Sequence, residues 1–304
     1  MKGRYFANQE TTEGFKRAIE YVSRAIEIDP NYARAYAALS LTYHLASEWQ
    51  LPPRDAMPKA KAAVDHALKL DDKLPEAHIR LAWVSMHYDW DWPAAEKEFK
   101  RAIELNPNDA ASHSSYAGYL STMGRHDDAI AERNLAEELD PLSPQGGAVL
   151  YLARSFDAAI YQSHKALELN PNSLAGRQWL GMAYEQKGMY QEAIAEFQKC
   201  KALDDTPDWL AFLGHAYGVS GRRTEAVSML GELKKRAKEG YVSPYYMALV
   251  YIGLGEKHPA IEWLERAFED RSGWMISLET NPQLDSLRSD SRFRDLLRRV
   301  GVSR

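Results

Sequence analysis

The sequence predicts an all-α solenoid, in which about eight helix–turn–helix units stack in serial order. Two observations predict it. Segments similar to RAIELNP, at residues 101–107, recur along the chain, and alanine recurs in phase with them. Glycine and proline also stand at matching places between these segments. A unit that recurs at such a period cannot bury its apolar side alone, so we expect each unit to pack against its neighbours.

The repeat is clearest when the copies are aligned on the alanine that opens the second helix of each unit. Successive alanines of this set lie 42, 35, 34, 30, 34, 33 and 34 residues apart. Small side chains at these places let the axes of two helices approach to about 8–10 Å. The eight alanines are Ala18, Ala60, Ala95, Ala129, Ala159, Ala193, Ala226 and Ala260.

Glycine and proline mark where the predicted helices end. Glycine adopts the left-handed conformation of a helix terminus at low cost, and proline biases the residue before it away from the helix. We therefore place turns at four glycines and four prolines. They are Gly124, Gly188, Gly221 and Gly255, and Pro30, Pro107, Pro141 and Pro171.

Two copies depart from the common length. The second carries about eight extra residues, and Pro52, Pro53 and Pro58 predict that these form a longer loop between its two helices. The fifth is four residues short, which is about one helical turn. We expect its first helix to be stunted, since Gly146 and Gly147 weaken it further, and we expect an irregularity in the solenoid there.

The stretch YDWDWPAAE at residues 88–96 suggests either a turn or a chemical site. Asp91 or Trp92 is placed to cap the following helix, and Pro93 suits a first turn that needs no amide donor. Trp90 and Trp92 can cover the apolar side of the turn. A metal or acid–base role is the alternative, but no histidine or third carboxylate stands at metal-ligand spacing. We interpret the stretch as a capped turn.

The repeat resembles the tetratricopeptide repeat, a helix–turn–helix unit of 34 residues. LGMAY at 180–184 and LGHAY at 213–217 carry the resemblance in the first helix, and the alanines carry it in the second. The resemblance covers residues 1–270 and implies a right-handed superhelix. Residues 271–304 are predicted to form a capping segment, because Phe293, Leu296, Leu297 and Val300 make an apolar stripe on one helix.

Longer stretches resemble the repeat region of large bacterial signalling proteins, in which a winged-helix, cyclase or kinase domain precedes the repeats. They are residues 2–43, the third repeat, and the tail SLETNPQLDSLRSDSRFRDLLRRVGV. Only eleven residues precede a second helix predicted at about Thr12–Ile28, so the chain is expected to begin inside a repeat. The resemblance implies a sensory or assembly region, and no catalytic or DNA-reading motif of an output domain is found.

Composition argues against several other classes of function. The net charge of −5 does not suggest a nucleic-acid binder, and Asp285, Asp290 and Asp295 dilute the arginines of the tail. No apolar run reaches the length of a membrane helix, and one cysteine, Cys200, suits a reducing compartment, so we expect a cytoplasmic protein. None of the nine histidines has zinc-ligand spacing. We expect no enzyme activity, no metal and no cofactor.

The sequence predicts a scaffold that binds a protein or peptide in its concave groove. First helices line that groove in a stacked solenoid. Homo-oligomerisation, and sensing of a small molecule near Trp83, His87 and Arg177, are alternatives. The candidate groove residues are Arg34, Leu41, His44, Trp83, Met86, His87, Tyr119, Arg177, Gln178, Met182, Glu185, His215, Tyr245, Leu249 and Ile252.

Overall fold

A computed structural model describes residues 12–142 and 146–302, and within them the chain forms the predicted all-α solenoid. Helix α2 (Thr12–Ile28) belongs to the first repeat, and the prediction that the chain begins inside this repeat concerns residues 1–11, which fall outside the described residues. Repeats two to eight each contain two helices. They are α3 (Ala33–Trp49) and α4 (Pro53–Leu70), α5 (Pro75–Val84) and α6 (Trp92–Leu105), α7 (Ala110–Thr122) and α8 (His126–Leu139), α9 (Gly147–Leu152) and α10 (Phe156–Leu169), α11 (Leu174–Gln186) and α12 (Tyr190–Leu203), α13 (Pro207–Val219) and α14 (Arg223–Arg236), and α15 (Pro244–Gly253) and α16 (Lys257–Glu269).

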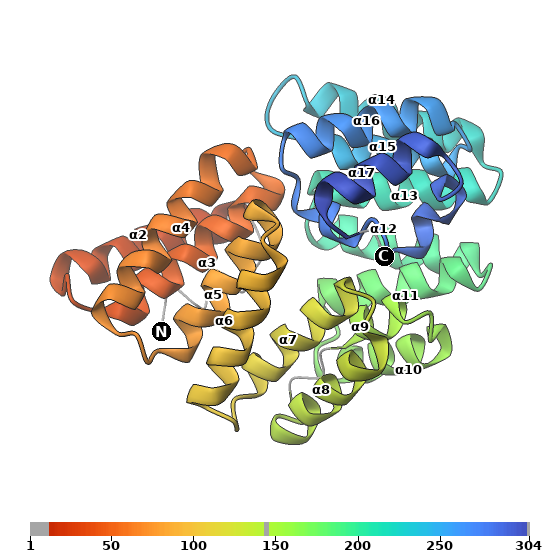
Figure 1. The fold of residues 1–304 in the computed structure, drawn as a ribbon. Coiled ribbons are helices and arrows are strands. Elements are labelled where there is room, and N and C mark those ends of the chain that lie inside the picture. The colour runs from red at the N-terminus through yellow and green to blue at the C-terminus, as the bar shows by residue number, and fades with distance from the viewer. Residues whose placement is uncertain (1–11, 143–145, 303–304) are drawn as a thin grey trace.

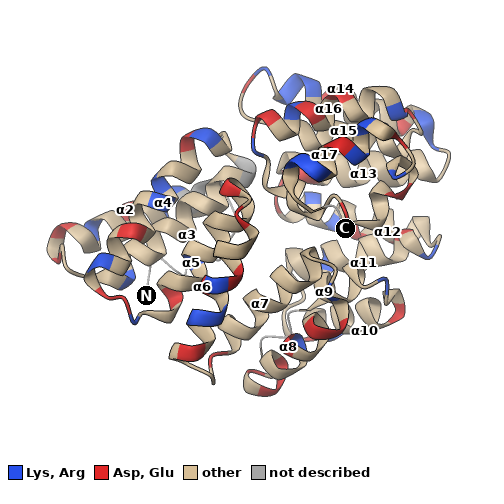
Figure 2. Ribbon diagram, in the orientation of Figure 1, with Lys and Arg blue, Asp and Glu red and all other residues tan. Residues whose placement is uncertain are grey.

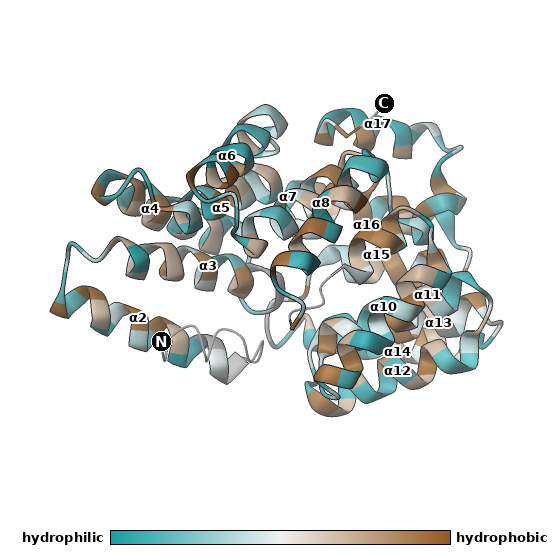
Figure 3. Ribbon diagram, turned by 90° about the horizontal axis from the view of Figure 1, so that it is seen from below, coloured by the Kyte–Doolittle hydropathy of each residue, from teal (hydrophilic) through white to brown (hydrophobic). Residues whose placement is uncertain are grey.

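The helices follow an arc around a central space (Figure 1). Helices α2 to α6 lie on one side, α7 to α10 continue the arc, and α11 to α17 occupy the other side, with the C-terminus near the middle of the view. Hydrophobic and hydrophilic stretches alternate along the helices, as expected where each helix buries one side (Figure 3). Lys and Arg are interspersed with Asp and Glu over the helices (Figure 2).

Each of the eight aligned alanines is fully buried in the second helix of its repeat. A small side chain is needed there because the first helix of the same unit crosses closely. The glycines of the two clearest first-helix motifs show how close this contact is. A Cβ atom on Gly181 would come within 2.6 Å of the Phe197 ring of α12, and one on Gly214 would come within 3.2 Å of the Met229 Cβ atom of α14. The repeated small residues therefore set the spacing between helices.

In repeats three to eight, the turn between the two helices contains a residue in the left-handed conformation. The predicted glycines occupy this place with φ between 66° and 81°. In the third and fifth repeats the same place is taken by Trp90, with φ of 56°, and Arg154, with φ of 60°. This conformation costs a non-glycine residue about 1–2 kcal/mol. Both side chains make distant contacts, which are described below.

The prediction for the second repeat was wrong. Its extra residues lengthen both helices instead of forming a longer loop, so that α3 has 17 residues and α4 has 18. Pro53 is the first residue of α4, where no amide donor is needed, and Pro58 lies inside the helix with its ring exposed. The prediction for the fifth repeat is confirmed, since α9 has only six residues and follows Gly146, which has φ of 145°.

The chain after α16 crosses to the inner side of the arc before it forms the capping helix. It contains η2 (Gly273–Ser277), η3 (Pro282–Leu287) and α17 (Ser291–Val300). The predicted apolar stripe of α17 is buried. Its arginines form ion pairs across the helix surface, and these pairs are Arg292 with Asp290, Arg298 with Asp295, and Arg299 with Glu265. We refer to residues 272–287 as the inner segment.

The third repeat meets the C-terminal region of the chain at the DWDW stretch. The Trp90 ring lies 5.0 Å from the ring of Phe268, and the Arg271 guanidinium lies 4.0 Å from the centre of the Trp90 ring. The indole Nε1 of Trp92 donates a hydrogen bond to the backbone carbonyl of Val300 at 2.9 Å. Arg271 also donates to the carbonyl of Tyr88. We call this set of contacts the closure contact.

Asp91 caps α6 as predicted, because its carboxylate accepts a hydrogen bond from the amide of Ala94 at 3.1 Å. Asp89 forms an ion pair with Lys61. The two tryptophans do more than cover their own turn, since both are buried against the C-terminal region. The stretch is therefore a capped turn that also joins the third repeat to the last one.

Replacing Trp90 should show how much the closure contact contributes. Trp90→Ala and Trp90→Gly both remove the contacts with Phe268 and Arg271, so both should unfold at a lower temperature than wild type. The glycine variant should be more stable than the alanine variant by about 1 kcal/mol, because glycine relieves the left-handed strain. Denaturation followed by circular dichroism measures this order.

Gly188→Ala is the matched control. Gly188 occupies the equivalent place in the sixth repeat with φ of 74°, and a Cβ atom there would meet nothing within 4 Å. This variant measures the backbone strain alone, which we expect to be about 1 kcal/mol. A Trp90→Gly protein as stable as wild type would contradict a role for the closure contact.

Candidate functional site

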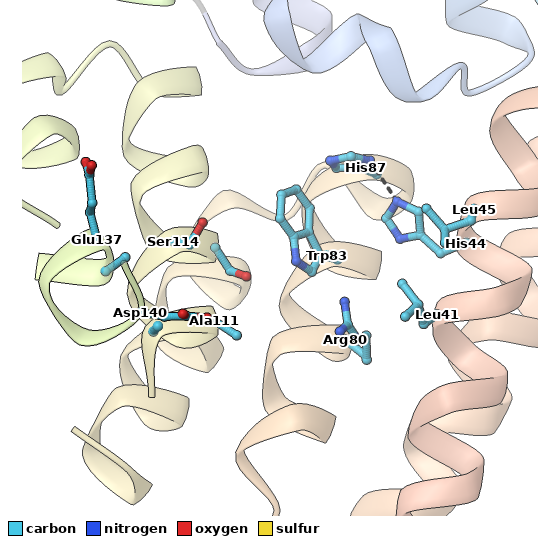
Figure 4. Close-up of a pocket in the computed structure, with 13 residues that line it drawn as sticks. Leu41, His44, Leu45, Arg80, Trp83, His87, Ala111, Ser114, Glu137 and Asp140 are labelled. Atoms are coloured by element: carbon cyan, nitrogen blue, oxygen red, sulfur yellow. Dashed lines mark hydrogen bonds between the residues drawn. The ribbon is translucent and has the colours of Figure 1, made fainter. Parts of the chain in front are cut away.

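The concave side of the arc contains three adjoining hollows, and Trp83 of α5 borders all of them. The first has a volume of about 430 Å³ and lies between α3, α5, α7 and α8. Leu41 and His44 stand on one wall, and Glu137 and Asp140 stand across from them (Figure 4). Arg80 lies between these walls, so the first hollow offers apolar, cationic and anionic groups in one place.

Two histidines form one wall of the first hollow. Nε2 of His44 and Nδ1 of His87 share a hydrogen bond of 3.1 Å, and the Trp83 ring lies nearly perpendicular to both imidazoles, with its centre 6.1 Å from that of His44 and 4.8 Å from that of His87 (Figure 4). Burial, together with the positive charge of Arg80, lowers the pKa of His44 to about 3. Burial, together with the neighbouring His44, lowers the pKa of His87 well below its usual value. Both imidazoles are therefore neutral at pH 7.

The second hollow exists because the fifth repeat is short. Its volume is about 600 Å³, and it lies between α7 and α11, where a first helix of full length would have stood. Because the six-residue α9 covers little of this space, side chains of the second helices α8 and α10 form the floor of the hollow. They include Arg133, Gln162 and Ser163. Trp83 borders one side and Trp179 the other. The missing helical turn thus opens a polar hollow in the groove.

The third hollow has a volume of about 210 Å³ and is bounded by the solenoid and by the inner segment. Trp83, Met86, Trp179 and Met182 line it from the first helices of the repeats, and Trp274 lines it from the inner segment. Unlike the first two hollows, it is mostly apolar.

The inner segment fills the rest of the groove along α11, α13 and α15. Gln283 donates a hydrogen bond to Glu185 at 2.9 Å and lies 3.4 Å from Nδ1 of His215. Asn281 donates to the hydroxyl of Tyr245, and Trp274 stacks on the Tyr245 ring. Leu278, Leu284 and Leu287 of this region are fully buried. The last three repeats therefore bind the chain's own C-terminal region.

The predicted groove residues fall into four groups. Those that line a hollow are Leu41, His44, Trp83, Met86, His87 and Met182. Those that the inner segment contacts are Glu185, His215 and Tyr245. Leu249 and Ile252 of α15 are buried, and the remaining four serve other contacts. These four are Arg34, Tyr119, Arg177 and Gln178.

Arg177 links two helices instead of facing the groove. It is the fourth residue of its helix, and the equivalent residues of two other repeats are His78 and His113. Each bonds to a glutamate of the second helix and to a backbone carbonyl six residues earlier. The glutamates are Glu98, Glu132 and Glu196, and the carbonyls belong to Asp72, Pro107 and Pro171.

The other three residues also have partners within the solenoid. The exposed Arg34 pairs with Glu76 at the start of α5. Tyr119 is buried and donates to the carbonyl of Trp92. The amide of Gln178 approaches the sulfur of Met182 at 4.0 Å.

Several residues that line the hollows were not predicted from the sequence. Arg80 lies one helical turn before Trp83, a spacing that could have revealed it. Glu137, Asp140, Gln162 and Ser163 belong to second helices, which were not expected to reach the groove. The short first helix of the fifth repeat was the available signal, since it uncovers them.

Cys200 and possible metal ligands are the remaining candidates for a chemical site. Cys200 is buried, and burial raises the pKa of its thiol to about 12, which disfavours the reactive thiolate. Among the residues that the structure describes, no group of three or more His, Cys, Asp or Glu side chains could hold a metal ion. Within the same residues, no helix combines the length and the apolar character that crossing a bilayer requires.

Comparison with known proteins identifies the repeat. Family models described as tetratricopeptide repeat match residues 98–131 and 176–207. The chain contains tetratricopeptide repeats. Superkiller protein 3 of Schizosaccharomyces pombe is 25% identical over 268 residues, which is 87% of this chain and 17% of that protein. Proteins with tetratricopeptide repeats generally mediate protein–protein interaction or assembly.

Two further relatives carry the same kind of similarity. Transcriptional regulator HilA of Salmonella typhimurium is 26% identical over 165 residues, or 53% of this chain and 30% of HilA. Hsp70-Hsp90 organizing protein 1 of Glycine max is 27% identical over 119 residues, or 38% of this chain and 21% of that protein. The chain therefore spans less than a third of the length of each of these relatives.

Solved structures share the fold of the tetratricopeptide-repeat solenoid. The APC/C hetero-tetramer Cut9-Hcn1 matches with a TM-score of 0.60 at 18% identity and covers 94% of this chain and 52% of that chain. Human IFIT1, solved as a dimer with PPP-AAAA, matches with a TM-score of 0.57 at 18% identity, over 84% of this chain and 68% of that chain. At such identity the likeness concerns the fold alone.

The buried histidine pair should make the fold sensitive to acid. Below about pH 6.5 the unfolded chain protonates both imidazoles, whereas the native state resists protonation until about pH 3 at His44. The contribution of the pair to stability is complete above pH 6.5 and is lost progressively as the pH falls through this window. Unfolding temperatures between pH 7 and pH 4 should therefore fall less steeply when both histidines are replaced by glutamine. Parallel curves for the wild type and this double variant would contradict the assignment.

Proposed function

We propose that the first and second hollows bind a segment of a partner protein. They lie side by side on the concave face, and Trp83 and Trp179 stand at their borders. Large aromatic side chains are frequent anchors of protein interfaces because they bury much apolar area with few rotatable bonds. One observation supports this proposal above the others. The inner segment fills the groove of the last three repeats and leaves these two hollows open.

The charges of the hollows indicate what kind of segment fits. Arg80 lies between the walls of the first hollow and Asp140 stands on one of them, while Arg133 of the second hollow forms an ion pair with Glu137 of the first. A segment of mixed charge with one or two apolar anchors would match both hollows, whereas a strongly charged segment of one sign would be repelled at one end. The amides and hydroxyls of Gln162 and Ser114 add polar partners.

We further propose that the chain is the interaction region of a larger bacterial signalling or transcriptional regulator. The similarity to a transcriptional regulator over 53% of this chain supports this role. The likeness of residues 2–43, of the third repeat and of the tail to such regulators supports it as well. In such a protein, occupation of the groove would report the presence of a partner to an output domain.

A photo-crosslinker in the groove tests partner binding directly. A photoreactive residue at Ser115, which borders both hollows, should capture a partner from a native lysate. The same residue at Tyr161, which is exposed on α10 and lines none of the hollows, should not. Equal capture at both positions would contradict groove binding, and a product consisting of two copies of this chain would indicate homo-oligomerisation instead.

Affinity for the captured partner should depend on Trp83. We expect Trp83→Leu to weaken binding by at least about tenfold, equivalent to about 1.4 kcal/mol, because an aromatic anchor is lost. Trp263→Leu is the matched control, since that partly buried indole on α16 lies away from the hollows. Titration by calorimetry compares the two, and similar affinities of both variants would argue against the proposal.

A further inference from the structure

The third hollow has the character of a small-molecule site. Three tryptophans line it, namely Trp83, Trp179 and Trp274, and they come from α5, α11 and the inner segment. Met86 and Met182 complete an aromatic and thioether wall, and thioethers make favourable contacts with aromatic rings. Few polar groups reach the surface of this hollow. Its lining therefore favours a planar, apolar group over a polar chain segment.

The size of the hollow limits what it can hold. Its volume is about 210 Å³, and an apolar protein cavity of about 150 Å³ accommodates benzene. One substituted aromatic ring, or two fused rings, would fill it. A peptide segment would not fit into the third hollow. The first and second hollows, at about 430 and 600 Å³, have more room for one.

Two buried polar atoms of the lining lack a hydrogen-bond partner. One is Oγ of Ser121, whose side chain is fully buried, and the other is Nε1 of Trp274. A buried donor without a partner is costly, by about 1–3 kcal/mol. Neighbouring atoms cover both donors, so an acceptor on a bound ring would partner one of them after that side chain turns toward the hollow. The hollow thus combines an aromatic wall with unused donors.

We propose that the third hollow binds a small aromatic molecule of one or two rings that carries a hydrogen-bond acceptor. The site is assembled from two parts of the chain, because Gly273, Trp274, Ile276, Ser277 and Asn281 belong to the inner segment and the remaining wall belongs to repeats three to six. A ligand there contacts both parts and therefore stabilises the docked inner segment by linkage. This inference does not depend on whether a protein binds in the other two hollows.

Calorimetry of the full chain with two probe compounds tests the chemistry of the site. Toluene and p-cresol have the same ring and methyl group, but only p-cresol carries an acceptor. We expect both to bind saturably, and p-cresol to bind about two- to tenfold more tightly, the equivalent of one hydrogen bond. Trp274→Phe keeps an aromatic ring on Tyr245 and removes the donor, so it should reduce this preference.

Two leucine variants test the location. Ala148 of α9 lines the third hollow, and Ala148→Leu should fill part of it and weaken p-cresol binding at least about tenfold. Ala111 of α7 is exposed and lines only the first hollow, so Ala111→Leu should leave the affinity unchanged. Far-UV circular dichroism checks that both variants fold. Gly118→Ala provides a second filling variant, since its Cβ atom would lie an ordinary 3.5 Å from the Trp83 ring.

Saturable binding of p-cresol that Ala148→Leu weakens and Ala111→Leu does not would support the site. Absence of saturable binding of either probe up to its solubility would overturn the proposal. Equal weakening by the two leucine variants would overturn it as well, because the probe would then bind elsewhere. If Ala148→Leu fails to fold, Gly118→Ala against Ala111→Leu gives the same decision.

Discussion

The structure depends on one long-range contact, in which Trp90 and Trp92 of the third repeat meet Phe268, Arg271 and the carbonyl of Val300. The described non-glycine residues with positive φ are Trp90, Arg154 and Arg271. Each joins the repeats to the C-terminal region, since Arg154 forms a bidentate pair with Asp285 and Arg271 lies over Trp90. Left-handed backbone is unfavourable for these residues, so their distant contacts must offset about 1–2 kcal/mol apiece.

Closure and the short fifth repeat together determine which part of the groove is open. The inner segment enters the arc beside the closure contact and covers the faces of α11, α13 and α15 through Gln283 and Asn281. At the fifth repeat the loss of one helical turn has the opposite effect and exposes second helices to the interior. The first and second hollows therefore lie between the second and sixth repeats, in the part of the groove that the inner segment does not cover.

The sequence predicted the parts of the fold that local periodicity determines, namely the buried alanines, the glycine turns, the stunted α9 and the Asp91 cap. The sequence did not predict the features that depend on contacts between distant parts of the chain. Nothing near Trp90 indicates that its partner lies almost 180 residues away. Glu185 and His215 stand at groove positions, but only the path of the inner segment shows that they are covered. Arg177 faces α12 because a glutamate there binds it, which helical phase alone does not reveal.

The closure contact also restricts how this architecture can change during evolution. In an open solenoid each unit contacts only its neighbours, so whole units can be duplicated or deleted while both ends remain free. Here the distance and rotation between Trp90 and Arg271 are the sum of the steps contributed by every intervening unit. Gain or loss of one unit would displace the third repeat relative to Phe268 and Arg271. Both tryptophans would then be exposed. The number of units in this stretch is consequently a geometric requirement, comparable to the strand number of a barrel.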